Sequence, residues 1–211
     1  MPPADLKSPQ SQSPITHPKV LLVEGVDAFH FFEALLLQLD LLLEIEIRNF
    51  GGVDDMARYL EALAATAGFA SVTSLGIVRD AETNAAFAFQ AVRNSLRRVG
   101  LSVPARPMFI AEGNPQVSVF ILPDCVNPGM LETLCLQALG PDPALPCVED
   151  YFTCLERRGI AMPPNQAKAY LHAFLASRSK PDLLLGQAAR AGYLYLDAPA
   201  FDQLKQFLGA L

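Results

Sequence analysis

Two acidic motifs follow two short apolar runs, and their carboxylates could bind a metal ion. The run at 20–23 is followed by Glu24, and the run at 75–78 is followed by Asp80 and Glu82. Three carboxylates that are held close together repel one another, and an oxygen-binding cation relieves that repulsion. The sequence therefore predicts a Mg²⁺ or Mn²⁺ site wherever the fold brings these acids together.

The elements around the motifs are typical of an α/β sheet. Each apolar run is short and is followed by a helical pattern, as expected for a buried strand. After Glu24, for example, Phe29, Phe32 and Leu36 recur at helical spacing. Ligands of open α/β sheets bind beyond the carboxyl ends of the strands. We therefore expect the three acids to converge at one edge of the sheet.

Each motif alone also has a structural explanation. An acid followed by a glycine, as in Glu24-Gly25, ends many α/β strands. Strand alternation would place Asp80 and Glu82 on the same side if the extended geometry continues. Acids near a helix N-terminus are also common because their negative charge interacts favourably with the positive end of the helix dipole. The pair of acidic strand ends together favours a functional interpretation.

The order of elements predicts an α/β core that is followed by helices. We expect a flexible tail at 1–18, an α/β domain at 19–140 and a helical extension at 141–211 that packs on the same domain. The runs 107–112 and 117–122, which flank Gly113-Asn114-Pro115, predict a hairpin added to the sheet. The expected strands are 19–24, 44–50 and 72–80, and the expected helices include 53–67, 83–99, a helix opening at Asn127-Pro128, 145–158, 164–177, 184–191 and 200–208.

Composition limits the function classes. The chain has 211 residues, of which 51% are hydrophobic, so it can build a sizeable core. The net charge of −6 argues against non-specific nucleic-acid binding by the surface as a whole. It does not exclude a local basic groove or a phosphate contact that a metal ion bridges. Charges interrupt the apolar stretches, so no membrane span is expected.

Cysteines and arginines add two further expectations. The four cysteines lack CxxC spacing, so a zinc site is not expected; they are interpreted as reduced core thiols of a cytoplasmic protein. Arg93, Arg97 and Arg98 lie off the buried face of their helix. They form either a solvated surface or a patch that faces phosphate.

The motifs resemble those of a known domain. Val23-Glu24-Gly25, the later Asp80-x-Glu82 and the glycine pair Gly51-Gly52 resemble the Toprim domain. The segment 120–132 (FILPDCVNPGMLE) is similar to a prokaryotic Toprim-related family of unknown function, and more distantly the chain resembles the overcoming-lysogenisation-defect (OLD) nucleases. The resemblance covers nearly all of the chain from residue 19 onward and implies a Toprim-like parallel sheet flanked by helices.

The resemblance also implies roles for individual residues. The residue at the position of Glu24 is a metal ligand or a general acid/base, and those at the positions of Asp80 and Glu82 bind Mg²⁺. In the OLD-like nucleases a further acid and a lysine complete a two-metal site, for which Glu132 and Lys168 are the candidates here. The implied function is Mg²⁺-dependent phosphodiester chemistry on nucleic acid, as in a nuclease.

The chain departs from the family pattern at two positions. Glu82 stands where the family often has a second aspartate, and Ala28 stands where many relatives carry an acid. The adjacent Asp27 either substitutes for that acid or caps the helix. Glu132 is either a second-metal ligand or only a favourable acid near a helix N-terminus. The alternative to a nuclease is therefore a non-catalytic Toprim-like module that binds a metal, a nucleotide or a partner protein.

Overall fold

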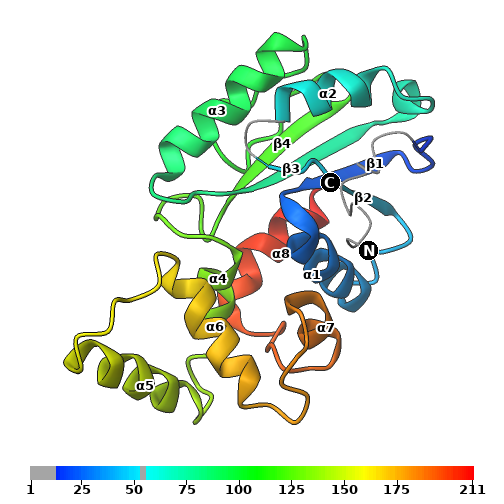
Figure 1. The fold of residues 1–211 in the computed structure, drawn as a ribbon. Helices are drawn as coiled ribbons and strands as arrows, with labels where there is room; N and C mark the ends of the chain where they lie inside the picture. The colour runs from blue at the N-terminus through cyan, green and yellow to red at the C-terminus, as the bar shows by residue number, and fades with distance from the viewer. Residues whose placement is uncertain (1–12, 53–55) are drawn as a thin grey trace, which may run out of the picture.

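A four-stranded sheet, all parallel, forms the centre of the molecule (Figure 1). The computed structural model describes residues 13–52 and 56–211. The strand order is β2-β1-β3-β4. Since all strands run in the same direction, their carboxyl ends meet at one edge, as the sequence predicts. The strands are β1 (Lys19–Val23), β2 (Ile45–Asn49), β3 (Ser74–Asp80) and β4 (Gln116–Leu122).

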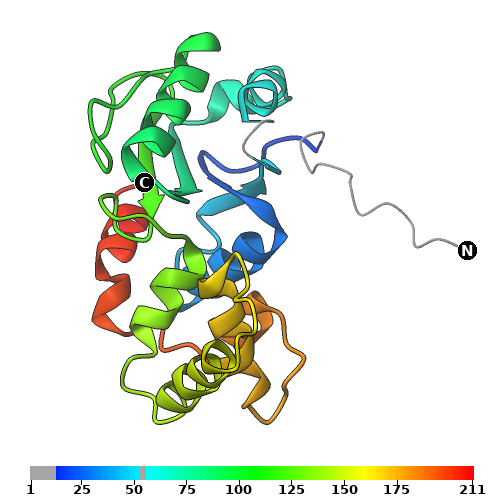
Figure 2. The same ribbon diagram turned by 60° about the vertical axis from the view of Figure 1, so that its left-hand side comes forward.

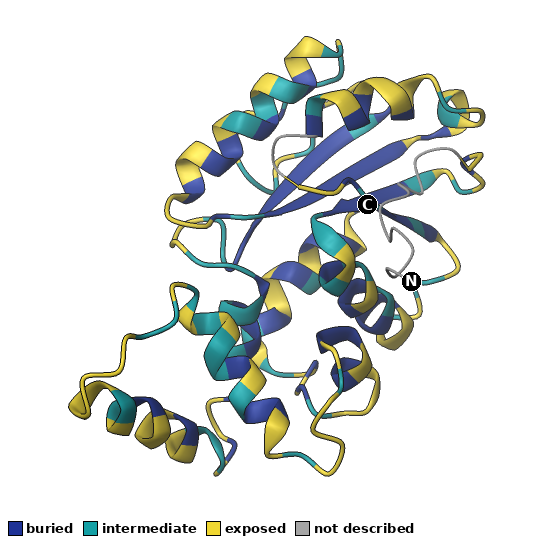
Figure 3. Cartoon of the chain, in the orientation of Figure 1, coloured by how far each residue is buried: buried dark blue, intermediate teal, exposed yellow. Residues whose placement is uncertain are grey.

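Helices cover both faces of the sheet. Helices α2 (Met56–Ala64) and α3 (Ala85–Arg98) pack on one face, where they share a core with Leu22 and Ile77. Helices α1 (Gly25–Gln38) and α8 (Asp202–Gly209) pack on the other face. Figure 3 shows that the strands between these layers are buried along most of their length. The predicted α/β fold class is thus confirmed.

The C-terminal part is helical and shares the core of the sheet. It contains α4 (Leu131–Ala138), α5 (Leu145–Arg157), α6 (Gln166–Ala176) and α7 (Leu185–Arg190), and α4 to α7 lie away from α2 and α3 (Figures 1 and 2). Helix α8 returns to the sheet, where the ring centroids of Phe207 and Phe120 lie 5.5 Å apart. One apolar cluster therefore joins the extension to the sheet.

The predicted hairpin is present only in part. Its second run is β4, which pairs in parallel with β3 from Ser74–Gln116 to Asp80–Leu122. Its first run meets β4 in the described structure only through the antiparallel bridge Ala111–Val117 and the Met108 N–H bond to the Val119 carbonyl. Residues 117–122 are buried on both faces although β4 is the edge strand, as expected for a parallel strand that helices cover on both faces.

The amino-terminal tail expected at 1–18 lies largely outside the described residues, which begin at Ser13. The last part of that tail, 13–18, contacts the sheet. Ile15 is 7% exposed, and the side chain of Arg48 donates to the carbonyls of Ser13 and Pro14 at 2.9 and 3.0 Å. Of the helix expected at 53–67, residues 53–55 also lie outside the described part.

The cysteines only partly follow the prediction. All four are free; Cys135 is buried and Cys125 is half-buried. Cys147 and Cys154 are exposed on α5, so the expectation of four core thiols is wrong for these two. Helix α5 buries only Val148 and Phe152, which leaves its remaining faces open to solvent. Within the described residues, no helix combines the length and the apolar character needed to cross a bilayer.

Candidate functional site

Glu24 lies at the junction of β1 and α1, where it is the N-cap residue. The side-chain oxygen of Asn49, at the end of β2, accepts hydrogen bonds from the backbone N–H groups of Gly25 (2.9 Å) and Gly51 (2.8 Å). Gly25 has a φ of +85°, which a glycine adopts without strain. Asn49 therefore fixes the position of Glu24. Asp27 lies in the first turn of α1 and does not cap it.

Asp80 is the last residue of β3 and connects to the start of α4. Its Oδ1 accepts a hydrogen bond from the backbone N–H of Leu131 at 3.0 Å. The same connection is held by two backbone hydrogen bonds between Glu82 and Gly129, at 2.9 and 2.8 Å. Extended geometry does not continue to Glu82, whose φ is +53° and whose side chain is exposed. The expected alternation of Asp80 and Glu82 therefore ends here.

Helix α4 begins later than the sequence predicts. Asn127-Pro128 was the expected start, and the first helical residue is Leu131. The carboxylate of Asp124 accepts hydrogen bonds from the backbone N–H groups of Val126 (3.0 Å) and Asn127 (2.7 Å), which holds this segment as a loop. The later start places Glu132 in the first turn of α4, beside Asp80.

Three of the predicted acids, Glu24, Glu82 and Glu132, lie within electrostatic reach of the fourth, Asp80. Burial, together with the negative charges of Glu24, Glu132 and Glu82, raises the pKa of Asp80 to about 7, although the Leu131 N–H acts in the opposite direction. Burial also raises the pKa of Glu24, against the nearby positive charge of Arg79. A cation at this position would relieve that repulsion.

The acids are gathered but are not arranged as a preformed metal site. In the described parts of the chain, no three His, Cys, Asp or Glu side chains are placed so that they could hold one ion. The buried Oε2 of Glu24 has no hydrogen-bond partner there and is available to a cation. The donors fit Mg²⁺ or Mn²⁺ because all of them are carboxylate oxygens. Binding would require these side chains to change rotamer.

Lys168 lies in the first turn of α6, close to the start of α1. Its Nζ is 3.9 Å from Oδ2 of Asp27. Asn165 caps α6 by accepting a hydrogen bond from the Lys168 backbone N–H at 2.9 Å, and its amide nitrogen lies 3.1 Å from the sulfur of Met130. These contacts bring the N-terminal ends of α1, α4 and α6 close to one another, and the ammonium group of Lys168 lies beside Asp27.

Arg79 is a site residue that the sequence reasoning missed. It is 7% exposed, and its Nη1 donates to the Ala88 carbonyl at 3.4 Å. Its buried Nε has no hydrogen-bond partner in the described structure. A charged residue within an otherwise apolar strand was the available signal. Arg79 places a positive charge near Glu24.

The arginines of α3 form a solvated surface. Arg98 pairs with Glu61 at 2.9 Å, and Arg97 donates to Asn94 at 2.9 Å. Arg93 donates to Gln90 at 3.2 Å, and its guanidinium lies 5.7 Å from the ring centroid of Phe89. These contacts within the protein favour the structural interpretation over a phosphate-facing patch.

Comparison with known proteins places the chain in a family. The family described as "Protein of unknown function (DUF3226)" matches residues 18–211, so the chain belongs to it. No curated protein matches the sequence.

Two solved structures are similar, and both are of the C-terminal region of the Xanthomonas campestris pv. campestris OLD protein. The one phased with mercury is 15% identical, with a TM-score of 0.50 and coverage of 93% of this chain and 97% of that chain. The one phased with iodine is 14% identical, with a TM-score of 0.44 and coverage of 92% and 95%. At this identity the first likeness concerns the fold alone.

Proposed function

We propose that the protein carries out Mg²⁺- or Mn²⁺-dependent phosphodiester chemistry on nucleic acid, as a nuclease of the Toprim type. The observation that carries this proposal is the position of Asp80. It lies at the carboxyl edge of a parallel sheet, where burial, together with the charges of Glu24, Glu132 and Glu82, raises its pKa to about 7. Such perturbed groups are common at functional sites because a substrate or a cation compensates for their mutual repulsion.

The residues have distinct roles in this proposal. Glu24, Asp80 and Glu82 would hold the metal ion, and Glu132 would contribute to a second site. A bound Mg²⁺ would stabilise the charge that develops on the oxygens of a phosphodiester. Glu24 can also accept or donate a proton, because burial raises its pKa. The ammonium group of Lys168, 3.9 Å from Asp27, would attract the phosphate to the edge of the acid cluster.

The second candidate is a non-catalytic module that binds a metal, a nucleotide or a partner protein. The observation in its favour is that no three of the described acids are arranged to hold a metal ion. The exposed Glu82, with its φ of +53°, also departs from the arrangement expected for a strand-end ligand. The likeness of the fold to the OLD C-terminal region fits both candidates.

Cleavage assays separate the two candidates. Plasmid DNA, single-stranded DNA and RNA are incubated with the full chain in Mg²⁺, in Mn²⁺ and in EDTA. The nuclease proposal predicts metal-dependent cleavage that Glu24→Gln and Asp80→Asn abolish. Glu61→Gln is the matched control, since Glu61 is an exposed acid on α2 that pairs with Arg98. Cleavage that persists in Asp80→Asn, or its absence from the wild type, would contradict the nuclease and leave the binding module.

A further inference from the structure

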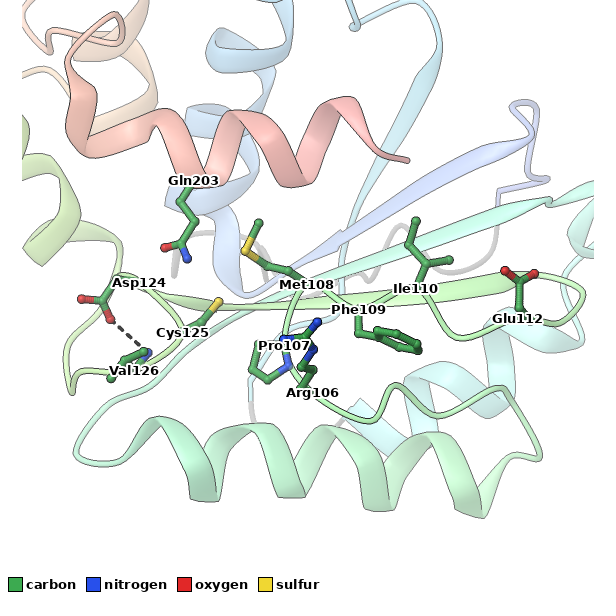
Figure 4. Close-up of a pocket in the computed structure, with 10 residues that line it drawn as sticks. All are labelled: Arg106, Pro107, Met108, Phe109, Ile110, Glu112, Asp124, Cys125, Val126 and Gln203. Atoms are coloured by element: carbon green, nitrogen blue, oxygen red, sulfur yellow. Dashed lines mark hydrogen bonds between the residues drawn. The ribbon is translucent and has the colours of Figure 1, made fainter.

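A pocket lies at the outer side of β4, the edge strand of the sheet, and outside the acid cluster. Its volume is about 660 Å³, within the range of pockets that bind small molecules. It is formed by three parts of the chain: the segment before β4, the loop after β4, and α8. Figure 4 shows Gln203 extending from α8 toward β4, with Met108 on the same side of the strand and with Arg106 and Phe109 on its other side. The lining residues are Arg106, Pro107, Met108, Phe109, Ile110, Glu112, Asp124, Cys125, Val126 and Gln203.

The walls of this pocket suit a flat and neutral ligand. Phe109 is 46% exposed although it is a large apolar residue, and the guanidinium of Arg106 lies 6.0 Å from the centroid of its ring. The pocket also contains two carboxylates, Glu112 and Asp124, which would repel a phosphate. Aromatic rings and guanidinium planes are the groups on which nucleobases stack. The base of a nucleotide therefore fits this pocket better than its phosphate.

The loop after β4 connects the pocket to the acid cluster. Asp124 and Val126 line the pocket, whereas Gly129 in the same loop makes both backbone hydrogen bonds to Glu82. Asp124 and Gly129 are five positions apart in the chain, so their Cα atoms lie at most roughly 18 Å apart. One strand of nucleic acid could therefore reach both.

We propose that the pocket at the outer side of β4 binds one unpaired nucleobase of a single strand, which stacks on Phe109 while a phosphodiester a few nucleotides away lies at the acid cluster. This inference rests on the proposed function, because it takes nucleic acid as the substrate. It adds that the substrate is single-stranded near the site, since a base in a duplex is already stacked and paired. Phe109 and Arg106 hold the base and do not contact the reacting atoms.

Binding in EDTA tests the pocket separately from the chemistry. The probe is a fluorescein-labelled single strand of about 16 nucleotides, a length that matches the larger sites of single-strand-binding folds. Its Kd is measured by fluorescence anisotropy with the full chain. Phe109→Ala should weaken binding roughly tenfold, which is about 1.4 kcal/mol, and Phe109→Tyr should keep the wild-type Kd. Tyr151→Ala is the control, because it removes another exposed aromatic ring, on α5.

Strands with abasic sites provide a second test. The wild type should bind a fully abasic strand about as weakly as Phe109→Ala binds the intact strand. Equal Kd values for Phe109→Ala and wild type, equal Kd values for intact and abasic strands, or binding of duplex alone would each overturn the pocket proposal. Metal-dependent cleavage with no effect of Phe109→Ala would overturn the pocket and leave the nuclease. Binding that depends on Phe109 without any cleavage would support the pocket and overturn the nuclease.

Discussion

Asp80 and Leu131 connect the end of the third strand to the start of a helix, through a hydrogen bond of 3.0 Å from the Leu131 backbone N–H to the Asp80 carboxylate. This bond places the carboxylate of Asp80 beside Glu132, in the first turn of α4. The position combines a favourable N–H donor with unfavourable burial and three neighbouring acids. The charge of Asp80 therefore changes near neutral pH and would respond to a bound cation.

The contribution of Asp80 to the stability of the metal-free protein should decrease as the pH rises. The pKa of the Asp80 carboxyl is about 7 in the folded protein, compared with an ordinary value of 3.8 for an aspartate. The stabilisation that comes from its protonated form is complete below pH 3.8 and is lost as the pH rises through 7. Over that window the contribution of Asp80 to the free energy of unfolding should fall by roughly 2–4 kcal/mol.

Urea denaturation in EDTA across this window measures the effect. Asp80→Asn removes the ionisable group but keeps an oxygen that can accept from Leu131. The difference in the free energy of unfolding between wild type and variant should therefore change with pH, and the variant should become the more stable protein above about pH 7. A difference that is constant from acid to neutral pH would contradict the proposed repulsion.

Divalent metal should raise the melting temperature of the wild type. Binding of Mg²⁺ or Mn²⁺ to the folded state alone stabilises it by mass action, by about 2.7 kcal/mol at a hundred times the Kd. Asp80→Asn should abolish this shift, whereas Glu61→Gln should keep it. Thermal unfolding with metal and with EDTA measures both variants. An equal shift in wild type and Asp80→Asn would place the metal elsewhere on the protein.

Asp142 should be important for the stability of the helical extension. Its side chain is 4% exposed and accepts hydrogen bonds from the Ala144 N–H (2.8 Å), from Tyr195 (2.8 Å) and from Arg178, with which it also pairs at 3.2 Å. Asp142→Asn removes the charge that faces the guanidinium, so we expect a loss of roughly 2 kcal/mol in the free energy of unfolding. Asp202→Asn, at an exposed pair 3.8 Å from Lys205, should have almost no effect. Equal urea midpoints for the two variants would be inconsistent with this role.

Gly186 should not tolerate a side chain. A Cβ on this residue of α7 would lie 2.2 Å from Cβ and 2.5 Å from the backbone carbon of His30 on α1. Gly186→Ala would push the two helices apart, at a cost of about 1–3 kcal/mol in the free energy of unfolding. Gly209→Ala, where nothing lies within 4 Å of the added Cβ, should be neutral or slightly stabilising. Thermal melts of both variants decide the matter; a stable Gly186→Ala protein would show that α7 can move.

The elements that the sequence predicted best are those with strong local patterns. The strands that lead to Glu24 and Asp80 are short and apolar because both of their faces are buried. That pattern can be recognised in the sequence alone. Their convergence followed from the rule that parallel strands end at one edge. The hairpin was predicted only in part, because a run of buried residues does not show which strand it pairs with. The main partner of β4 is β3, which is distant in sequence.

The residues that the sequence did not reveal act through tertiary contacts. Asn49 holds the start of α1, on a neighbouring strand 24 residues later in the chain than Gly25. Arg79 affects Glu24 from another strand. Helix α4 starts at Leu131 and not at Asn127, because the Asp124 carboxylate holds the preceding loop by hydrogen bonding. Asp124 thereby competes with Asn127, the expected helix cap. The tertiary structure decides which of two such local hydrogen-bonding arrangements forms.

The central claim, that the acids at the sheet edge bind a divalent metal, is tested most directly by a crystal structure of the protein soaked in Mn²⁺. The anomalous signal locates the ion without reference to the ligands. We predict one peak at about 2.0–2.3 Å from carboxylate oxygens of Glu24 and Asp80, with Glu82 or Glu132 completing the site. A map with full occupancy of Mn²⁺ elsewhere, or with no peak near Asp80 at saturating metal, would contradict the claim.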